Sequence, residues 1–170
     1  MNFKQQQKVK ISQKIEKEYL IKGSYFPFFV DMFNQIICNA IEHSKLQLKN
    51  LKLDIIINSD VETILENDVS HTFKYDENAH YLNINFINNM SSTINPNIVN
   101  KKVGDIFAKF NNKEILEKYS QTEGGSGLYK LRTIVHYHIY EKYLIYYSVE
   151  ERKFSLGIIL EIDKLKVGGE

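Results

Sequence analysis

The chain of 170 residues is poor in the residues that stabilise small proteins through cross-links or rigid turns: it has one cysteine and two prolines. The single cysteine, Cys38, excludes a disulfide framework and a zinc site built on several cysteines. No apolar run approaches the roughly 18 residues of a membrane-spanning helix, and the first residues contain no apolar signal core. These absences predict a cytoplasmic protein without a membrane partner.

An excess of charge of one sign is also lacking, because 22 Lys and Arg residues are balanced by 21 Asp and Glu residues. A balanced chain has no overall field that would attract nucleic acid, so we expect no nucleic-acid partner. Hydrophobic residues make up 43% of the chain and charged residues 25%, which is typical of a globular domain. A chain of this length buries enough surface to fold as one domain without cross-links.

Hydrophobic periodicity predicts both helices and strands. Residues 1–22 are expected to form an N-terminal helix, which ends at Gly23. Apolar residues at three- and four-residue steps predict a second helix from Pro27 to Ile41. Apolar or alternating runs predict strands at 51–57, 72–75, 81–87, 140–149 and 154–162.

The stretch from residue 89 to residue 124 has no clear period apart from a short helical piece at 115–119. A weakly patterned stretch of this length inside a compact domain is usually a functional loop or lid. A glycine-rich turn, 124–127, then precedes another amphipathic helix. This order of elements predicts an α+β fold: a two-layer α/β sandwich whose mixed, mostly antiparallel sheet carries helices on one face.

Three polar features interrupt this apolar framework. Gln35, Asn39, Glu42 and His43 share one edge of the second helix. Asn88 continues the apolar face of the strand at 81–87, where a hydrophobic residue is expected. The glycines before the last helix leave backbone N–H groups free to meet an anion. Taken singly, these features also fit a solvated helix edge, a turn at a strand end and an ordinary glycine turn.

Taken together and in this order, the three features resemble the motifs of the GHKL ATPase superfamily, which includes the ATP-binding domain of histidine kinases. The segment Asn39-Ala40-Ile41-Glu42-His43 is similar to its N box. The strand that ends on Asn88 is similar to its first glycine box, and 125–135 to its second. The resemblance covers roughly residues 25–163. It implies a histidine-kinase-like ATP-binding domain at 23–170, with a lid at 89–124.

The resemblance implies ATP and Mg²⁺ as cofactors. Asn39 would coordinate Mg²⁺ through its amide oxygen, the hard ligand that this ion prefers. Asn88 would accept a hydrogen bond from the adenine amine, and Lys101 or Lys102 would reach the γ-phosphate. The residues that the resemblance places around ATP are Asn39, His43, Asn88, Gly125, Gly127, Leu128 and Lys130.

The sequence departs from the family pattern at informative positions. Gln35 stands where hydrolytic members carry a general-base Glu, and a neutral amide cannot take a proton, so intrinsic ATP hydrolysis should be slow. The first glycine box has Asn88 in place of its Asp, and Met90 and Ser92 in place of its glycines. No histidine precedes His43, so the chain is not expected to be a complete histidine kinase.

The resemblance therefore implies an ATP-dependent protein kinase of signal transduction that transfers the γ-phosphoryl group to a partner protein. One alternative is a non-catalytic, degenerate nucleotide-binding switch, as part of a larger protein or as an anti-sigma-like regulator. A plain interaction domain without a ligand is the other. All three are compatible with an oligomer.

Overall fold

The computed structural model describes residues 10–15, 19–59, 61, 76–120, 127–139 and 142–167. Within these residues, five strands form one sheet in the order β1-β2-β3-β5-β4. The strands are β1 (Lys10–Ile15), β2 (Lys52–Asn58), β3 (Tyr81–Asn89), β4 (Tyr143–Glu150) and β5 (Lys153–Glu161). β1 and β2 are parallel, whereas the other neighbours are antiparallel. The sheet is mixed and mostly antiparallel, as predicted.

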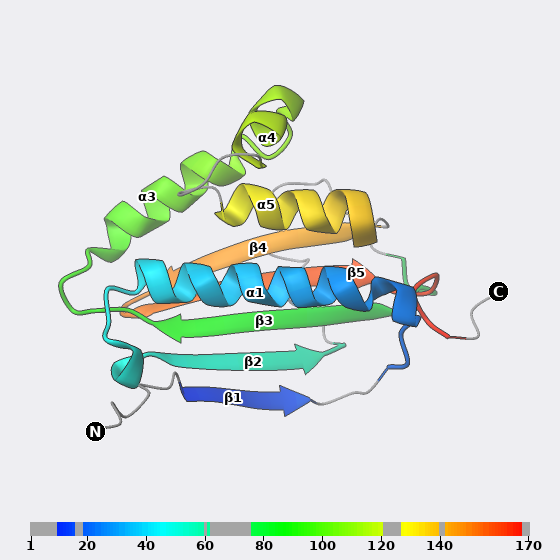
Figure 1. Ribbon diagram of the computed structural model, residues 1–170, viewed down its shortest axis with the longest axis horizontal. Helices are drawn as coiled ribbons and strands as arrows, with labels where there is room; N and C mark the ends of the chain where they lie inside the picture. The colour runs from blue at the N-terminus through cyan, green and yellow to red at the C-terminus, as the bar shows by residue number, and fades with distance from the viewer. Residues whose placement is uncertain are drawn as a thin grey trace, which may run out of the picture.

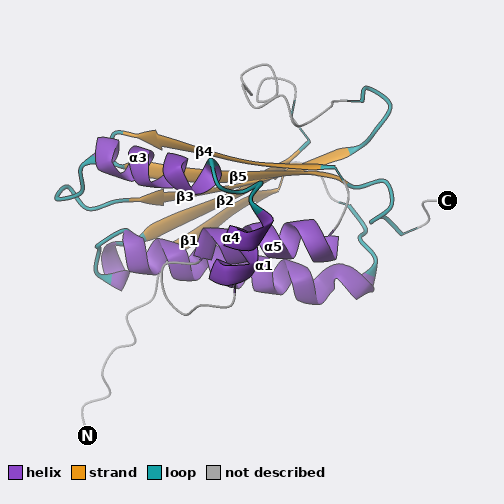
Figure 2. Ribbon diagram, turned by 90° about the horizontal axis from the view of Figure 1, so that it is seen from above, coloured by secondary structure: helices purple, strands orange, loops and turns teal. Residues whose placement is uncertain are grey.

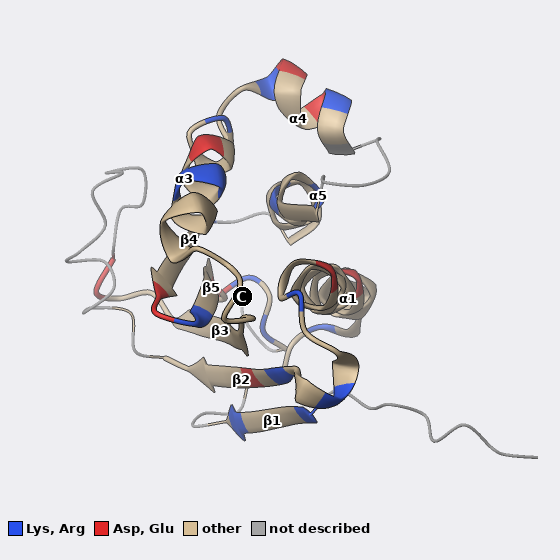
Figure 3. Ribbon diagram, turned by 90° about the vertical axis from the view of Figure 1, so that its left-hand side faces the viewer, with Lys and Arg blue, Asp and Glu red and all other residues tan. Residues whose placement is uncertain are grey.

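The helices of the described chain are α1 (Phe26–His43), α3 (Pro96–Phe107), α4 (Lys113–Ser120) and α5 (Gly127–Ile134). A π-helical turn, Val135–Ile139, continues α5. α1 and α5 pack side by side over one face of the sheet, and α3 lies along its β4 margin (Figures 1 and 3). The predicted α+β two-layer sandwich is confirmed. In the part of the chain that is described, no helix has the length and apolar character needed to cross a membrane.

The core lies between the sheet and the layer of α1 and α5 (Figure 2). Pro27 stands in the first turn of α1, where its fixed φ suits a helix start. Further along, Met32 and Ile36 are buried one turn apart. Phe33 meets Phe86 of β3 edge-on, with ring centroids 5.2 Å apart. Burying an apolar side chain of this size stabilises the fold by about 1.5–3 kcal/mol, so this apolar stripe fixes α1 on the sheet.

The prediction of an N-terminal helix is wrong over the residues that are described there. Lys10–Ile15 is strand β1, which pairs with β2 in parallel. The Lys10 N–H donates to the Leu51 carbonyl, and the Ser12 hydroxyl donates to the Asp54 carboxylate. The helical period of this segment is weak, and pairing with β2 satisfies its backbone groups instead, so tertiary context overrides the local pattern. The predicted strand at 72–75 lies outside the described residues.

The segment predicted as a weakly patterned lid contains two helices. The helical piece at 115–119 is confirmed as part of α4, but α3 was not predicted. Asn95 caps α3, because its side chain accepts a hydrogen bond from the Asn97 N–H at 3.0 Å, and Pro96 follows at the first helical position. Phe110 and Leu116 are buried in the main core. Much of this segment is therefore anchored to the domain.

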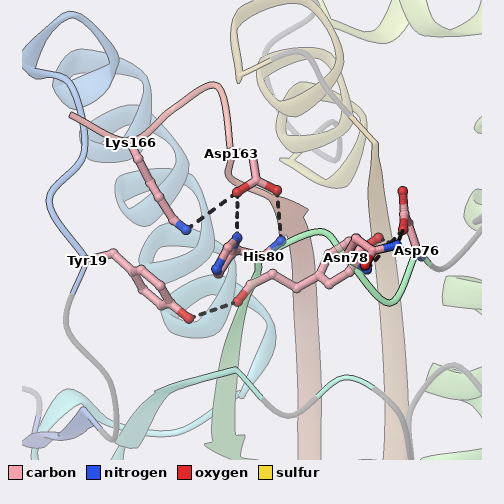
Figure 4. Close-up of polar contacts among 7 residues, drawn as sticks. Tyr19, Asp76, Asn78, His80, Asp163 and Lys166 are labelled. Atoms are coloured by element: carbon pink, nitrogen blue, oxygen red, sulfur yellow. Dashed lines mark hydrogen bonds and ion pairs between the residues drawn. The ribbon is translucent and has the colours of Figure 1, made fainter. Parts of the chain in front are cut away.

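A polar cluster ties the start of β3 to the segments near both chain ends (Figure 4). The backbone N–H of His80 donates to Asp163 at 2.8 Å, and its ring Nδ1 lies 2.7 Å from the same carboxylate. Lys166 Nζ is 3.5 Å from this carboxylate, and the Tyr19 hydroxyl donates to the Tyr81 carbonyl at 3.4 Å. Burial opposes ionisation of Asp163, but the hydrogen bonds from His80 outweigh it and lower the pKa of the carboxyl group.

Candidate functional site

The N-terminus of α5 meets the side of α1 at Asn39. A Cβ atom on Gly127 would overlap the amide oxygen of Asn39 and lie 2.5 Å from its nitrogen, so glycine is required for this approach. Asn39 Nδ2 is buried, and nothing in the described chain accepts a hydrogen bond from it. A buried donor without an acceptor costs about 1–3 kcal/mol. A ligand that accepts a hydrogen bond at this point would remove that cost.

The first turn of α5 supplies further donors beside Asn39. The first four N–H groups of an α-helix have no partner within the helix, and the helix dipole places partial positive charge there. α5 begins at Gly127, the residue that contacts Asn39. Side-chain and backbone donors thus lie at the same helix junction, and a helix N-terminus of this kind is a common binding place for phosphate and other anions.

A groove of about 380 Å³ runs between α1 and α5. Gln35 and Lys130, both predicted site residues, line it from opposite helices, one turn from Asn39 and Gly127 respectively. The groove also contains residues that were not predicted, although their three- and four-residue spacing places them on the same helix faces. Its full lining is Asp31, Asn34, Gln35, Cys38, Lys130, Thr133 and Ile134.

Asn88 occupies the end of β3 on the core side of the sheet, as its place in the alternating pattern predicted, and is 7% exposed. Its Nδ2 donates to the Asn89 carbonyl at 3.0 Å. This bond commits the amide nitrogen and leaves Oδ1 as an acceptor. The Ser91 N–H donates to the Ser44 carbonyl at 2.8 Å, so the end of β3 lies beside the end of α1, toward the same side of the molecule (Figure 1).

Other predicted site residues lie apart from this contact. His43 is exposed on the last turn of α1, and Leu128 packs against the core. Lys101 and Lys102 are exposed on α3, which lies beside β4 rather than beside α1 (Figure 3). Gly125 lies outside the described residues. Of the predicted set, the structure brings Asn39 and Gly127 into direct contact and Gln35 and Lys130 into one groove.

The far end of α5 is held by aromatic and basic side chains outside the predicted site. The Arg132 guanidinium lies 4.9 Å from the ring centroid of Tyr143, whose hydroxyl is 3.1 Å from His136 Nδ1. Burial lowers the pKa of Arg132 and raises that of Tyr143 to about 12. Phe28 stacks on His138 with centroids 4.5 Å apart. These contacts join α5 and its π-helical turn to β4 and α1, and so hold Gly127 in place.

Over the described ranges, no three His, Cys, Asp or Glu side chains gather as they would around a metal ion. The sequence matches no protein-family model, and no curated protein matches it either. What the chain does must therefore be inferred from its own residues.

Proposed function

We propose that this chain is a GHKL-type domain that binds ATP with Mg²⁺ and transfers the γ-phosphoryl group to a partner protein. The observation that supports this proposal best is the buried, unpartnered Nδ2 of Asn39, in contact with Gly127 at the N-terminus of α5. Phosphate oxygens are the acceptors that such a set of donors favours.

The residues at this point fit a magnesium nucleotide. Asn39 Nδ2 would donate to a phosphate oxygen together with the first-turn N–H groups of α5. Asn39 Oδ1 would ligate Mg²⁺, which typically keeps several waters and takes one or two protein oxygens beside the phosphates. Bound in this way, the ion supplies charge neutralisation for phosphoryl transfer, a reaction that depends mainly on positioning and electrostatics.

Asn88 would read the base. Because its Nδ2 is committed to the Asn89 carbonyl, it presents the acceptor Oδ1. An acceptor pairs with the exocyclic amine of adenine, whereas the carbonyl oxygen of guanine at the same position would be repelled. An amide held in this orientation would accept the hydrogen bond from adenine as a carboxylate would, although its neutral hydrogen bond is weaker than a charge-assisted one.

Gln35 supports transfer over hydrolysis. It lines the groove next to the proposed phosphate site, and its amide can orient a water molecule without removing the proton. Lys130, on the opposite wall, adds positive charge. The same Gln35 amide also favours a second candidate function, a switch that binds ATP without turning it over.

Calorimetric titration of ATP, with and without Mg²⁺, tests the binding site. We expect Asn39→Ala to fold but to lose the Mg²⁺-dependent part of ATP binding. The matched control is Asn97→Ala, an exposed asparagine on α3 that does not line the groove, which should bind as the wild type does. If Asn39→Ala kept its full Mg²⁺ dependence, the proposed site would be wrong.

Labelled ATP separates the kinase from the switch. The chain would be incubated with a cell extract and ATP carrying a labelled γ-phosphate, with Asn39→Ala run in parallel. A kinase produces a labelled protein band that is absent with the variant. A switch binds ATP in calorimetry and yields no such band.

A further inference from the structure

The two edge strands of the sheet differ in what covers them. At the β4 edge, the Tyr147 ring packs against Phe107 of α3 with centroids 4.7 Å apart, and its hydroxyl donates to the Asn100 carbonyl at 3.3 Å. At the other edge, no described element lies beyond β1, and all six residues of the strand are exposed (Figures 1 and 3). An uncovered edge strand presents unpaired N–H and C=O groups that can pair with another chain.

The backbone of β1 has a defined outward side. The Lys10 N–H donates to the carbonyl of Leu51, the residue just before β2. The backbone N–H and C=O groups of Lys10, and of every second residue after it, therefore point toward β2. Successive residues of a strand direct their N–H and C=O groups to opposite edges. Ile11, Gln13 and Ile15 therefore present theirs to the uncovered edge.

The same three residues carry their side chains on the helix-covered face of the sheet. Ile11 stands beside Leu53 of β2, which is buried in the core. Ile11 is nevertheless 52% exposed and Ile15 50% exposed. The apolar layer of the sheet thus continues to the edge without being covered there.

We propose that β1 pairs with β1 of a second copy of this chain, antiparallel and around a two-fold axis at Gln13. In this register Ile11 of each copy lies opposite Ile15 of the other, and Gln13 lies opposite itself. All three outward-facing residues then meet outward-facing partners, so each opposed pair can exchange both backbone hydrogen bonds. The two sheets join into one, with the helices of both copies on the same face.

The sequence of β1 disfavours the neighbouring registers. An axis at Ser12 would place Lys10 opposite Lys14, and an axis at Lys14 would place Lys14 opposite itself. Like charges directly opposite one another are destabilising, and both shifts also set isoleucine against glutamine. A two-fold axis midway between two neighbouring residues of β1 would place a residue from one face of the sheet opposite a residue from the other face. The axis at Gln13 avoids these conflicts, and it pairs more of β1 than an axis at Ile11 or Ile15 would.

Charge complementarity also favours this register. On the open face, Lys14 of one copy lies opposite Ser12 of the other, whose hydroxyl donates to the Asp54 carboxylate one strand further in. Opposite charges thus approach across the axis.

Because α3 covers the other edge, the assembly stops at two copies. A contact confined to two short strands is at the small end of specific interfaces, so we expect a weak dimer. It needs no nucleotide and does not depend on the proposed function.

Single-cysteine cross-linking tests both the pairing and its register. Cys38 is exposed, so the variants would be made in a Cys38→Ser background. In a hydrogen-bonded antiparallel pair, opposed Cα atoms are about 5.5 Å apart, within disulfide range. Gln13→Cys should therefore form a disulfide-linked dimer under mild oxidation. In the matched control Ser12→Cys, strand spacing and rise put the two Cα atoms about 8 Å apart, beyond that range.

Sedimentation velocity over a range of protein concentrations gives a second measurement without cross-links. Wild type should show concentration-dependent dimers, whether or not ATP is present. Gln13→Pro should remain monomeric with an unchanged unfolding temperature, because it removes only an outward-facing N–H. Equal cross-linking of the Ser12→Cys and Gln13→Cys variants, or a wild type that stays monomeric at every concentration, would overturn the proposal.

Discussion

The two ends of β3 use polar side chains in opposite ways. Where the strand begins, the Asp163 carboxylate is paired with both His80 and Lys166 (Figure 4). Where it ends, beside the last turns of α1, Asn39 keeps a buried amide nitrogen that no described group accepts from. The paired cluster holds the chain ends to the sheet. The unpaired donor adds nothing to folding, and for that reason we propose a phosphate oxygen as its partner.

The largest expected effect comes from placing a general base, a glutamate, at position 35 in the groove between α1 and α5. Gln35→Glu places a carboxylate where the amide now lies, and general-base catalysis typically contributes about 10²–10⁴-fold. We expect intrinsic ATP hydrolysis to rise by about a hundredfold, measured as phosphate release. Asn34→Glu, on the same helix but one position away, controls for added charge. An unchanged rate in a Gln35→Glu protein that still binds ATP would remove Gln35 from the reacting centre.

Filling the contact between the two helices should abolish most binding. The Cβ of Gly127→Ala would overlap the Asn39 amide, so the helix end and the donor must separate. ATP affinity should fall by about a hundredfold, or about 2.8 kcal/mol, in calorimetry. Gly23→Ala is the control, because a Cβ there meets no atom within 4 Å. Equal ATP affinity in both variants would mean that phosphate does not bind at this contact.

A smaller effect is expected at the base-reading position. Asn88→Ala removes the fixed acceptor, whose net hydrogen bond is worth about 0.5–1.5 kcal/mol. ATP affinity should fall by about tenfold or less, while GTP affinity should hardly change, so the preference for ATP narrows. Asn85→Ala, on the opposite face of the same strand, should leave the preference intact. A preference for ATP that survives Asn88→Ala would assign base reading to another residue.

The smallest expected effect is on the free energy of unfolding, through Asp163 at the start of β3, and it depends on pH. Because the pKa of Asp163 is lowered in the folded protein, its stabilisation is present above the unfolded value of about 3.9 and is lost as pH falls through the folded value. The pair with His80 is largely solvent-exposed, so Asp163→Asn should cost only about 1 kcal/mol at neutral pH. Urea unfolding measures this difference, which should disappear in acid. Nucleotide affinity should not change.

Most of the fold was predictable because its signals are local. The stripe of α1, the alternation of β3 and the amphipathic pattern of α5 each follow from residue spacing. β1 was mispredicted because its strand state depends on pairing with β2, more than 35 positions along the chain. α3 was missed although Asn95-Pro96 is a helix start, because a turn has the same composition and polar residues dilute the apolar stripe that includes Val103.

The candidate site was predictable in its residue types but not in its contacts. The sequence singled out Asn39, Asn88 and Gly127 because amides on apolar faces and glycines before a helix are unusual there. The resemblance gave Asn88 the role of an acceptor, and the hydrogen bond from its Nδ2 to the Asn89 carbonyl leaves Oδ1 available for that role. The resemblance also implied that Lys101 or Lys102 reaches the γ-phosphate, and no local pattern indicated that their helix, α3, packs against β4.

The sequence by itself determined the α+β class, the apolar faces of the helices and strands, and the absence of a base at Gln35, because these depend on residue type and short-range period. Only the tertiary structure decided that Asn39 meets Gly127, and that among the described elements α3 covers the β4 edge whereas none lies beyond β1. Those outcomes join residues far apart in the chain, and they are set by how whole elements pack, which no local pattern encodes.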